Sequence, residues 1–347
     1  MADKKSFETI MLGISSGLTG DYDKDLDYLK EESEKYKDHE FGKEILRAIG
    51  RMMYEMLPDD RKKDLDEALG RDMMGIDAAI EEVRFNIYKK DFDKALRLIE
   101  DTVQEQEKAP MFEDDSVSEY HNFREPMEEF LYAELDHPEK TLRGATINYA
   151  EMYMLYGCIL VELKRLDEAE AALKKAMKWN PVAANIAFEH AETMKMRGRI
   201  DDFLDCTKKI FKYAFRPADL ARCYRNLSYY FVEKKEYETA VCCLLFSTQF
   251  EKHDLVQSEL YYISQVSGTM FNPTEEELNK CFEENEIPLG PNVEILKIAY
   301  GYGRHFYESG NMDAAAYFLS IFTNFINDEE ANKMLEDAKA KVEQQEG

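Results

Sequence analysis

Residues 149–181 read YAEMYMLYGCILVELKRLDEAEAALKKAMKWNP. Apolar residues recur in this stretch at three- and four-residue spacing, the pattern of amphipathic helices. The segment Leu166-Asp167-Glu168-Ala169 in its middle has the order apolar, acidic, variable, small. The stretch therefore predicts a helix, a tight turn and a second helix that begins close to Leu166.

The same order of residues returns elsewhere in the chain. It is found at Phe92–Ala95, Tyr237–Ala240 and Met312–Ala315, and at Ile200–Phe203 with an apolar residue in place of the small one. Mostly small residues stand twelve positions before the last residue of each segment: Val83, Gly157, Ala191, Ser228 and Gly303. Mostly apolar residues stand four positions after it: Ile99, Leu173, Thr207, Leu244 and Leu319. Such self-similarity predicts an array of repeated units.

Each position of the pattern has a physical reason. The small residue lets the two helices of a unit approach closely, and the two apolar positions form the buried stripe of the second helix. The acidic residue begins that helix, where we expect it to cap free N–H groups and to meet the positive end of the dipole.

The spacing of the units is also informative. Asp167 and Asp201 are 34 residues apart, and Asp201 and Glu238 are 37 apart. The gaps from Asp93 to Asp167 and from Glu238 to Asp313 are 74 and 75 residues. Each wide gap is therefore predicted to contain one degenerate unit.

The best unit resembles a tetratricopeptide repeat, a helix–turn–helix of 34 residues. The resemblance rests on Tyr153, Tyr156, Gly157, Leu160, Ala169, Leu173, Ala176 and Pro181. It extends over roughly residues 76–330, with departures at His190, Thr207 and Ser228. The segment from about 120 to 305 more loosely resembles a group of such proteins from Gram-positive bacteria. The resemblance implies an all-α fold, a right-handed superhelix of stacked units whose concave face binds a peptide or protein.

Outside the repeats, the pattern predicts further helices. Residues 1–75 are interpreted as an N-terminal helical bundle that caps the array, and residues 331–347 as a C-terminal capping helix. An insertion at 108–145 is predicted to hold an acidic loop at 108–122 and a helix at about 124–135. A long loop in a compact array is often functional, but a tolerated insertion is the simpler interpretation.

Composition excludes several classes of protein. The net charge is −26, with 45 basic and 71 acidic residues, which argues against nucleic acid as a partner. We see no membrane-spanning or secretory segment and interpret the six cysteines as reduced core thiols of a cytoplasmic protein. No catalytic, metal-binding or cofactor motif stands out, so we expect no enzyme and no cofactor. The oligomeric state stays open.

One candidate binding surface emerges from the offset face of the first helices. It consists of Arg222, Arg225, Asn226 and Tyr229 in one unit and Lys297, Tyr300, Arg304 and Tyr307 in the last. This set predicts a locally basic, tyrosine-rich groove that captures an extended peptide. The alternative is that Arg222 and Arg225 pair with Glu189 and Glu192 of the preceding unit.

Two functions follow. The first is a non-enzymatic scaffold or adaptor that binds a peptide or protein in the concave groove. The alternative is a peptide-responsive signalling regulator of the Gram-positive type, with residues 1–75 as its effector part, an interpretation that rests on architecture alone.

Overall fold

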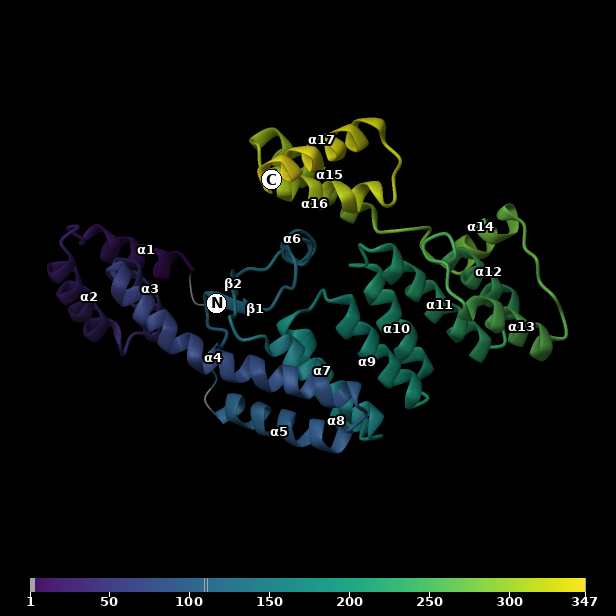
Figure 1. Cartoon of the computed structure of the whole chain (residues 1–347), viewed down its shortest axis with the longest axis horizontal. Coiled ribbons are helices and arrows are strands. Elements are labelled where there is room, and N and C mark those ends of the chain that lie inside the picture. Colours follow the sequence, from purple (N-terminus) through teal and green to yellow (C-terminus); the bar gives the residue numbers. More distant parts are fainter. Residues whose placement is uncertain (1–3, 109, 111, 347) are drawn as a thin grey trace. The chain divides into compact units, whose positions relative to one another are not determined.

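The computed structural model describes residues 4–108, 110 and 112–346 and is an all-α repeat fold (Figure 1). The helices are α1 (Lys4–Ser16), α2 (Tyr22–Tyr36), α3 (Gly42–Met56), α4 (Asp59–Tyr88), α5 (Phe92–Lys108), α6 (Pro126–Asp136), α7 (Tyr149–Glu162), α8 (Leu166–Trp179), α9 (Ala184–Met196), α10 (Ile200–Phe211), α11 (Pro217–Glu233), α12 (Tyr237–Ser247), α13 (Leu255–Ser267), α14 (Glu275–Glu284), α15 (Val293–Ser309), α16 (Met312–Thr323) and α17 (Glu329–Glu346). Two short strands, β1 (Ser118–His121) and β2 (Thr141–Gly144), pair in parallel.

The chain forms two compact units. Unit 1 contains residues 1–122 and 138–159, and unit 2 contains residues 123–137 and 160–347. The helix α4 continues without a break through residue 75, the predicted limit of the N-terminal bundle. Helix bounds therefore mark no domain boundary there, and the predicted domain limits stay a prediction.

In unit 1, the first three helices share a small core. Ile14 of α1, Leu29 of α2 and Ile45 of α3 are almost fully buried together with Phe41 and Ile49. Farther along, the strand pair is held by Asn122, whose side-chain amide donates to the backbone oxygens of Ala145 (2.9 Å) and Ile147 (2.8 Å). The predicted acidic loop at 108–122 thus ends in a β-strand; its residues 109 and 111 lie outside the described part of the chain.

In unit 2, consecutive helices from α8 to α12 pack each against the next. The helices α13 and α14 both pack against α12, and α15, α16 and α17 pack among themselves. Between these two groups the segment Ile287–Gly290 crosses α11, where the Tyr224 hydroxyl donates to the Pro288 oxygen (2.6 Å) and accepts from the Gly290 N–H (2.8 Å). The last helix pair begins only after this crossing segment.

The turns inside the helix pairs confirm the repeat at the level of the backbone. At each turn one residue has a positive φ between 60° and 86°: Lys90, Lys164, Gly198, Lys235 and Gly310. The next N–H bonds back to a carbonyl five residues earlier, as Arg165 does to Leu160 and Glu236 to Phe231. This is the Schellman geometry that ends helices. Each of these residues stands three positions before the acidic residue of the sequence pattern.

The small and apolar positions of the pattern are buried as predicted. Ala169, Ala240 and Ala315 are fully buried, and so are Leu173 and Leu319 four residues later. The small residue twelve positions before the buried alanine is needed most at Gly303. A Cβ added there would lie 2.8 Å from Cγ of Leu319. The close approach of α15 and α16 therefore depends on a missing side chain.

The prediction for the acidic position is only partly right. Asp167 and Asp201 lie in the first turns of α8 and α10, but neither helix has a side-chain cap. Asp167 instead lies 2.6 Å from Arg197 at the end of α9, and Asp201 lies 2.7 Å from Lys234 at the end of α11. The acidic residue of one pair thus contacts the first helix of the next pair.

The two wide gaps of the sequence have different contents. The gap before Asp313 holds the pair α13 and α14, and α14 begins with a capping box of Thr274 and Glu277. The gap before Asp167 holds β1, α6 and β2 in place of a helix pair, so the predicted degenerate unit is wrong there.

Candidate functional site

The first helices of three successive pairs place a set of polar and aromatic side chains close together. We call Lys195 of α9, Arg225 and Tyr229 of α11, and Glu259 and Tyr262 of α13 the α9–α11–α13 surface. The Lys195 ammonium lies 4.3 Å above the ring of Tyr229, and the ring edge of Tyr229 meets Phe203 behind it at 5.7 Å. The ring of Tyr229 is thereby fixed from two sides.

The two arginines of the sequence prediction already have partners in the fold. The guanidinium of Arg222 lies 4.3 Å above the ring of Phe188 and 3.6 Å from Glu189, as the alternative interpretation predicts. Arg225 is 15 % exposed, and its Nη1 lies 3.0 Å from Glu251, not beside Glu192. Asn226 bonds from Nδ2 to Thr207 of α10 at 3.3 Å and so helps to join two helices.

The surface is not cationic overall. Three cations, Lys195, Arg222 and Arg225, lie among the glutamates Glu189, Glu192, Glu233, Glu251 and Glu259. Nearby glutamates thus outnumber the three cations, and the predicted peptide-binding groove stays a prediction. These glutamates belong to α9, to the end of α11, to the segment after α12 and to α13.

Glu259 stands out among these carboxylates. Burial raises the pKa of its carboxyl group, and the charges of Arg225, Lys195 and His253 oppose that shift only in part. Burial also raises the pKa of Tyr229, and the neighbouring charges of Glu233 and Glu192 add to it. A half-buried carboxylate of this kind gains from any additional cation that approaches it.

The second predicted set, on α15, has a different environment. Tyr307 donates from its hydroxyl to Asp337 of α17 at 2.6 Å, and Tyr300 packs its ring on Phe322 at 5.0 Å. Lys297 and Arg304 pair with Glu294 (2.8 Å) and Glu308 (2.7 Å) on their own helix. The two tyrosines therefore belong to the packing of the last three helices.

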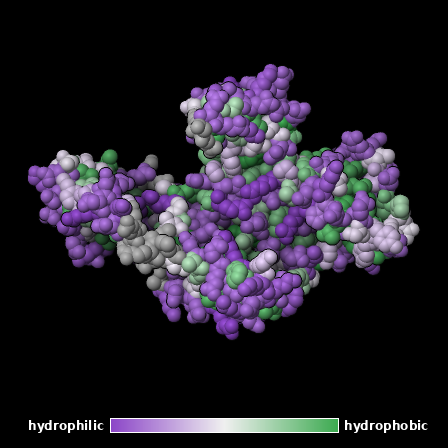
Figure 2. Space-filling view, viewed as in Figure 1, coloured by the Kyte–Doolittle hydropathy of each residue, from purple (hydrophilic) through white to green (hydrophobic). Residues whose placement is uncertain are grey.

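Sequence reasoning did not include α13 in the candidate binding surface. The α13 side chains Leu255, Tyr261, Tyr262 and Val266 are large, apolar or aromatic, and 44–68 % exposed. The face of the molecule in Figure 2 is mostly hydrophilic, so such side chains are the exception. The sequence did contain one signal for this helix. It holds more apolar residues than one buried stripe needs, although it lies in a gap where no clear repeat was visible.

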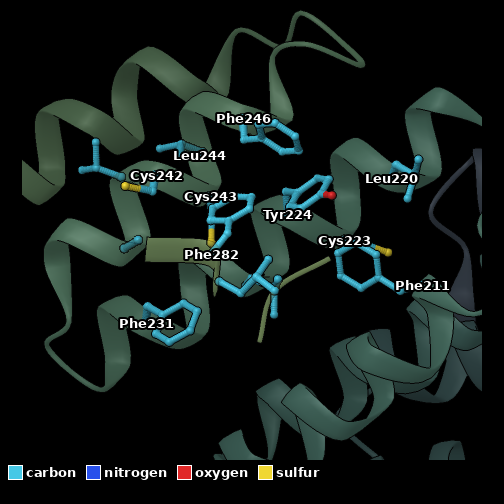
Figure 3. Packing of buried hydrophobic residues seen from close by; sticks show 14 of the residues in the cluster. Phe211, Leu220, Cys223, Tyr224, Phe231, Cys242, Cys243, Leu244, Phe246 and Phe282 are labelled. Carbon is cyan, nitrogen blue, oxygen red and sulfur yellow. The ribbon is translucent and has the colours of Figure 1, made fainter. Parts of the chain in front are cut away.

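Behind this surface lies a dense aromatic core (Figure 3). Tyr224 is fully buried and lies 4.9 Å from Phe246 and 5.1 Å from Phe211, measured between ring centroids. Cys223 and Cys243 lie in the same core, and burial raises the pKa of both thiols. The structure describes all six cysteines, and none of them forms a disulfide. The core thus makes α11 a rigid support for its outer face.

Two features are absent from the described residues. They contain no group of three or more His, Cys, Asp or Glu side chains placed to hold a metal ion. Within the same ranges, every helix is too short or too polar to cross a membrane.

Comparison with known proteins gives one family match. A model of the tetratricopeptide repeat matches residues 150–182, which contain α8 and nearly all of α7. No curated protein matches the sequence.

Two solved structures are similar over 78 % of this chain. One is described as the functional characterization of Pseudomonas aeruginosa pilF, with 11 % identity, 99 % of that chain covered and a TM-score of 0.41. The other is a putative protein binding protein from Bacteroides ovatus, with 14 % identity, 98 % covered and a TM-score of 0.26. At such TM-scores neither structure says anything about the function of this chain.

Proposed function

We propose that this tetratricopeptide-repeat-containing protein is a non-enzymatic interaction module that holds a segment of a partner protein on the α9–α11–α13 surface. The repeat supports a protein-binding role in general. The observation that carries the finer proposal is Tyr262, which is 56 % exposed and interacts with Tyr229. It stands one helical turn after Glu259, whose carboxyl interacts with the charge of Arg225.

The residue types fit such a role. Tyrosine and arginine are enriched in protein interfaces, because they offer a large contact area and hydrogen bonds at low entropic cost. Tyr229 is held by Lys195 and Phe203, so little ordering remains to be done on binding. The half-buried carboxylate of Glu259 favours a partner segment that brings a lysine or arginine to it.

The surface can be tested with a matched pair of variants. Tyr261 and Tyr262 are neighbours on α13 and are 68 % and 56 % exposed, but consecutive helical residues point about 100° apart. We expect Tyr262→Ala to lose the partners that the wild-type chain captures in an affinity pull-down from its host, and Tyr261→Ala to keep them. Both variants should keep the wild-type melting temperature, since neither side chain is buried.

A variant at Arg222 provides a second test in the same pull-down experiment. Its side chain is 39 % exposed, and its removal leaves Glu189 near the surface, so Arg222→Ala should fold normally and bind less. Identical partners for the wild type, Tyr262→Ala and Arg222→Ala would contradict the proposal. Arg225 is a poor choice, because a glutamate there would face both Glu251 and Glu259.

A further inference from the structure

The helix α6 is an element of unit 2 that the chain supplies from unit 1. The residues before Phe123 and after His137 belong to unit 1, and residues 123–137 belong to unit 2. The helix has no paired helix next to it in the sequence, unlike the helices of the repeats. Its contacts in unit 2 are with α15, α16, the end of α8 and the connection between α10 and α11.

One face of α6 is apolar and packs into the core of unit 2. Met127 and Leu131 have no exposed surface, and they share a core with residues of unit 2: Phe215, Ile295, Ala299, Phe318 and Ile321. Phe130, on the same face, lies 4.1 Å from the ring of Tyr302 and 5.1 Å from that of Phe318. Anchors at positions i, i+3 and i+4 are the pattern by which an amphipathic helix binds a groove.

We call the surface of unit 2 against which α6 packs the seat of α6. At the edge, or rim, of this contact, α6 carries acidic residues and the seat carries basic or hydrogen-bond-donating residues. Glu125, just before α6, pairs with Arg216 and accepts from the Tyr317 hydroxyl at 2.9 Å. Asp136, at the end of α6, lies 2.7 Å from the ammonium of Lys212.

Two further carboxylates complete the rim. Glu128 accepts from the buried amide of Asn180 at 2.8 Å, and Glu134 accepts from the Tyr302 hydroxyl at 2.7 Å. Four of the five carboxylates on and next to α6, all except Glu129, thus have a partner in unit 2. Such complementarity of charge sets specificity.

The seat is longer than the helix that fills it. A cavity of about 490 Å³ opens beside Glu125 and is lined by Phe215, Arg216, Tyr317 and Ile321 among others. Phe215 and Ile321 also belong to the core that buries α6, so the apolar floor continues past the first residue of the helix. A helix that begins earlier than Pro126 would find additional surface there.

We propose that the seat of α6 is a recognition site for an acidic amphipathic helix of a partner protein, and that α6 fills it in cis. The partner helix carries apolar anchors in the spacing of Met127, Phe130 and Leu131, with acidic residues at both ends. It displaces α6 by binding in the same manner and by extending into the cavity beside Glu125. The seat of α6 shares no residue with the α9–α11–α13 surface, but Glu251, the ion-pair partner of Arg225, lines the cavity beside Glu125.

A partner helix must compete with α6, which is tethered to its own binding site, and the experiment has to take this competition into account. A tethered segment competes at an effective concentration of about millimolar, so a free helix of equal affinity cannot replace it at lower concentrations. Weakening α6 should therefore reveal the site. The probe is a fluorescent peptide of residues 123–137, and the measurement is fluorescence anisotropy with the full-length chain.

The main variant is Phe130→Ala with Leu131→Ala in the chain, not in the peptide. We expect it to bind the peptide at least about tenfold more tightly than the wild type does, since weakening the competitor frees the seat. A chain with Glu129→Ala, a change at an exposed position of the same helix, should behave as the wild type. A peptide with Leu131→Glu should not bind.

A second variant covers the case in which the double alanine chain does not fold. Glu134→Lys with Asp136→Lys changes only exposed positions and removes rim contacts while keeping the buried anchors. It should also bind the peptide more tightly than the wild type. A folded variant that binds no better than the wild type would show that α6 is a permanent part of the core and would overturn the proposal. The Tyr262→Ala pull-down is independent of this result.

Discussion

At the scale of single residues, two glycines of α15 show how packing and propensity compete. Gly303 faces α16, where a Cβ would lie 2.8 Å from Cγ of Leu319, whereas a Cβ on Gly301 would meet no atom within 4 Å. Alanine is a better helix former than glycine by about 0.5–1 kcal/mol, but forcing atoms into a packed core costs about 1–3 kcal/mol.

The two positions should therefore respond with opposite signs. We expect Gly301→Ala to raise the free energy of unfolding by about 0.5–1 kcal/mol and Gly303→Ala to lower it by about 1–2 kcal/mol. Urea denaturation of the two variants beside the wild type measures both. Equal effects at the two sites would mean that α15 and α16 are not in close contact at Gly303.

The negative charge of Glu170 stabilises the folded state. Its carboxylate accepts from Lys174 (2.6 Å) on its own helix and from Arg197 (2.5 Å) and Arg199 (2.9 Å) at the end of α9. The bond from Lys174 and the charges of both arginines lower the pKa of Glu170, against the opposing effect of burial. The charged form thus stabilises the folded state above the ordinary carboxyl pKa, and this contribution is lost as the pH falls through the lowered value.

The pH dependence gives a direct test. Glu170→Gln should cost about 2 kcal/mol at neutral pH, because charge-assisted bonds are lost. The difference from the wild type should shrink as the pH is lowered through and below 4, as followed by denaturant unfolding at several pH values. Glu168→Gln, which removes an exposed pair with Arg165, is the control and should change little. A difference that stays constant with pH would show that the charge of Glu170 does not matter.

At the scale of the elements, the turn within each helix pair is the unit that repeats most faithfully. The same backbone conformation is adopted by lysine at positions 90, 164 and 235 and by glycine at positions 198 and 310. A left-handed conformation costs an L-residue about 1–2 kcal/mol, while glycine adopts it freely. Lysine turns therefore carry a small strain that the packed helices on both sides impose.

Equivalent turns should again give effects of opposite sign. Lys235→Gly should stabilise the chain by about 0.5–1 kcal/mol, since relief of strain exceeds the added entropy of the unfolded state. Gly198→Ala should destabilise it by about 1 kcal/mol. Thermal unfolding of both variants compares them, and a stabilising Gly198→Ala would be inconsistent with a left-handed turn at that position.

Helices and turns were predictable because their signals are local. The bounds of α8, α10, α12 and α16 follow from the acidic repeat, and the capping box of α14 was visible in Thr274 and Glu277. The pairing of β1 with β2 was not predictable, since four residues in each strand carry too little pattern. Local signals could not predict against which other element each helix or strand packs.

At the scale of the whole molecule, long-range contacts decided what the sequence left open. The helix at 124–135 was predicted, but its burial in unit 2 depends on Phe215 and Phe318, which lie far along the chain. Arg225 was assigned to a groove, and the partner it finds, Glu251, follows α12. The sequence prediction of the candidate surface therefore left out the neighbouring glutamates, because charge balance is a property of neighbours in space, and the surface itself stays a prediction.

The bond between Asn180 and Glu128 has a practical consequence for spectroscopy. The sequence contains a single tryptophan, and it is Trp179, the residue just before Asn180 at the end of α8. An indole is sensitive to the polarity around it, and excitation at the red edge of its absorption avoids the 21 tyrosines. The intrinsic tryptophan emission thus reports on the seat of α6 without a label, because Trp179 directly precedes Asn180. Its wavelength should shift when α6 leaves the seat.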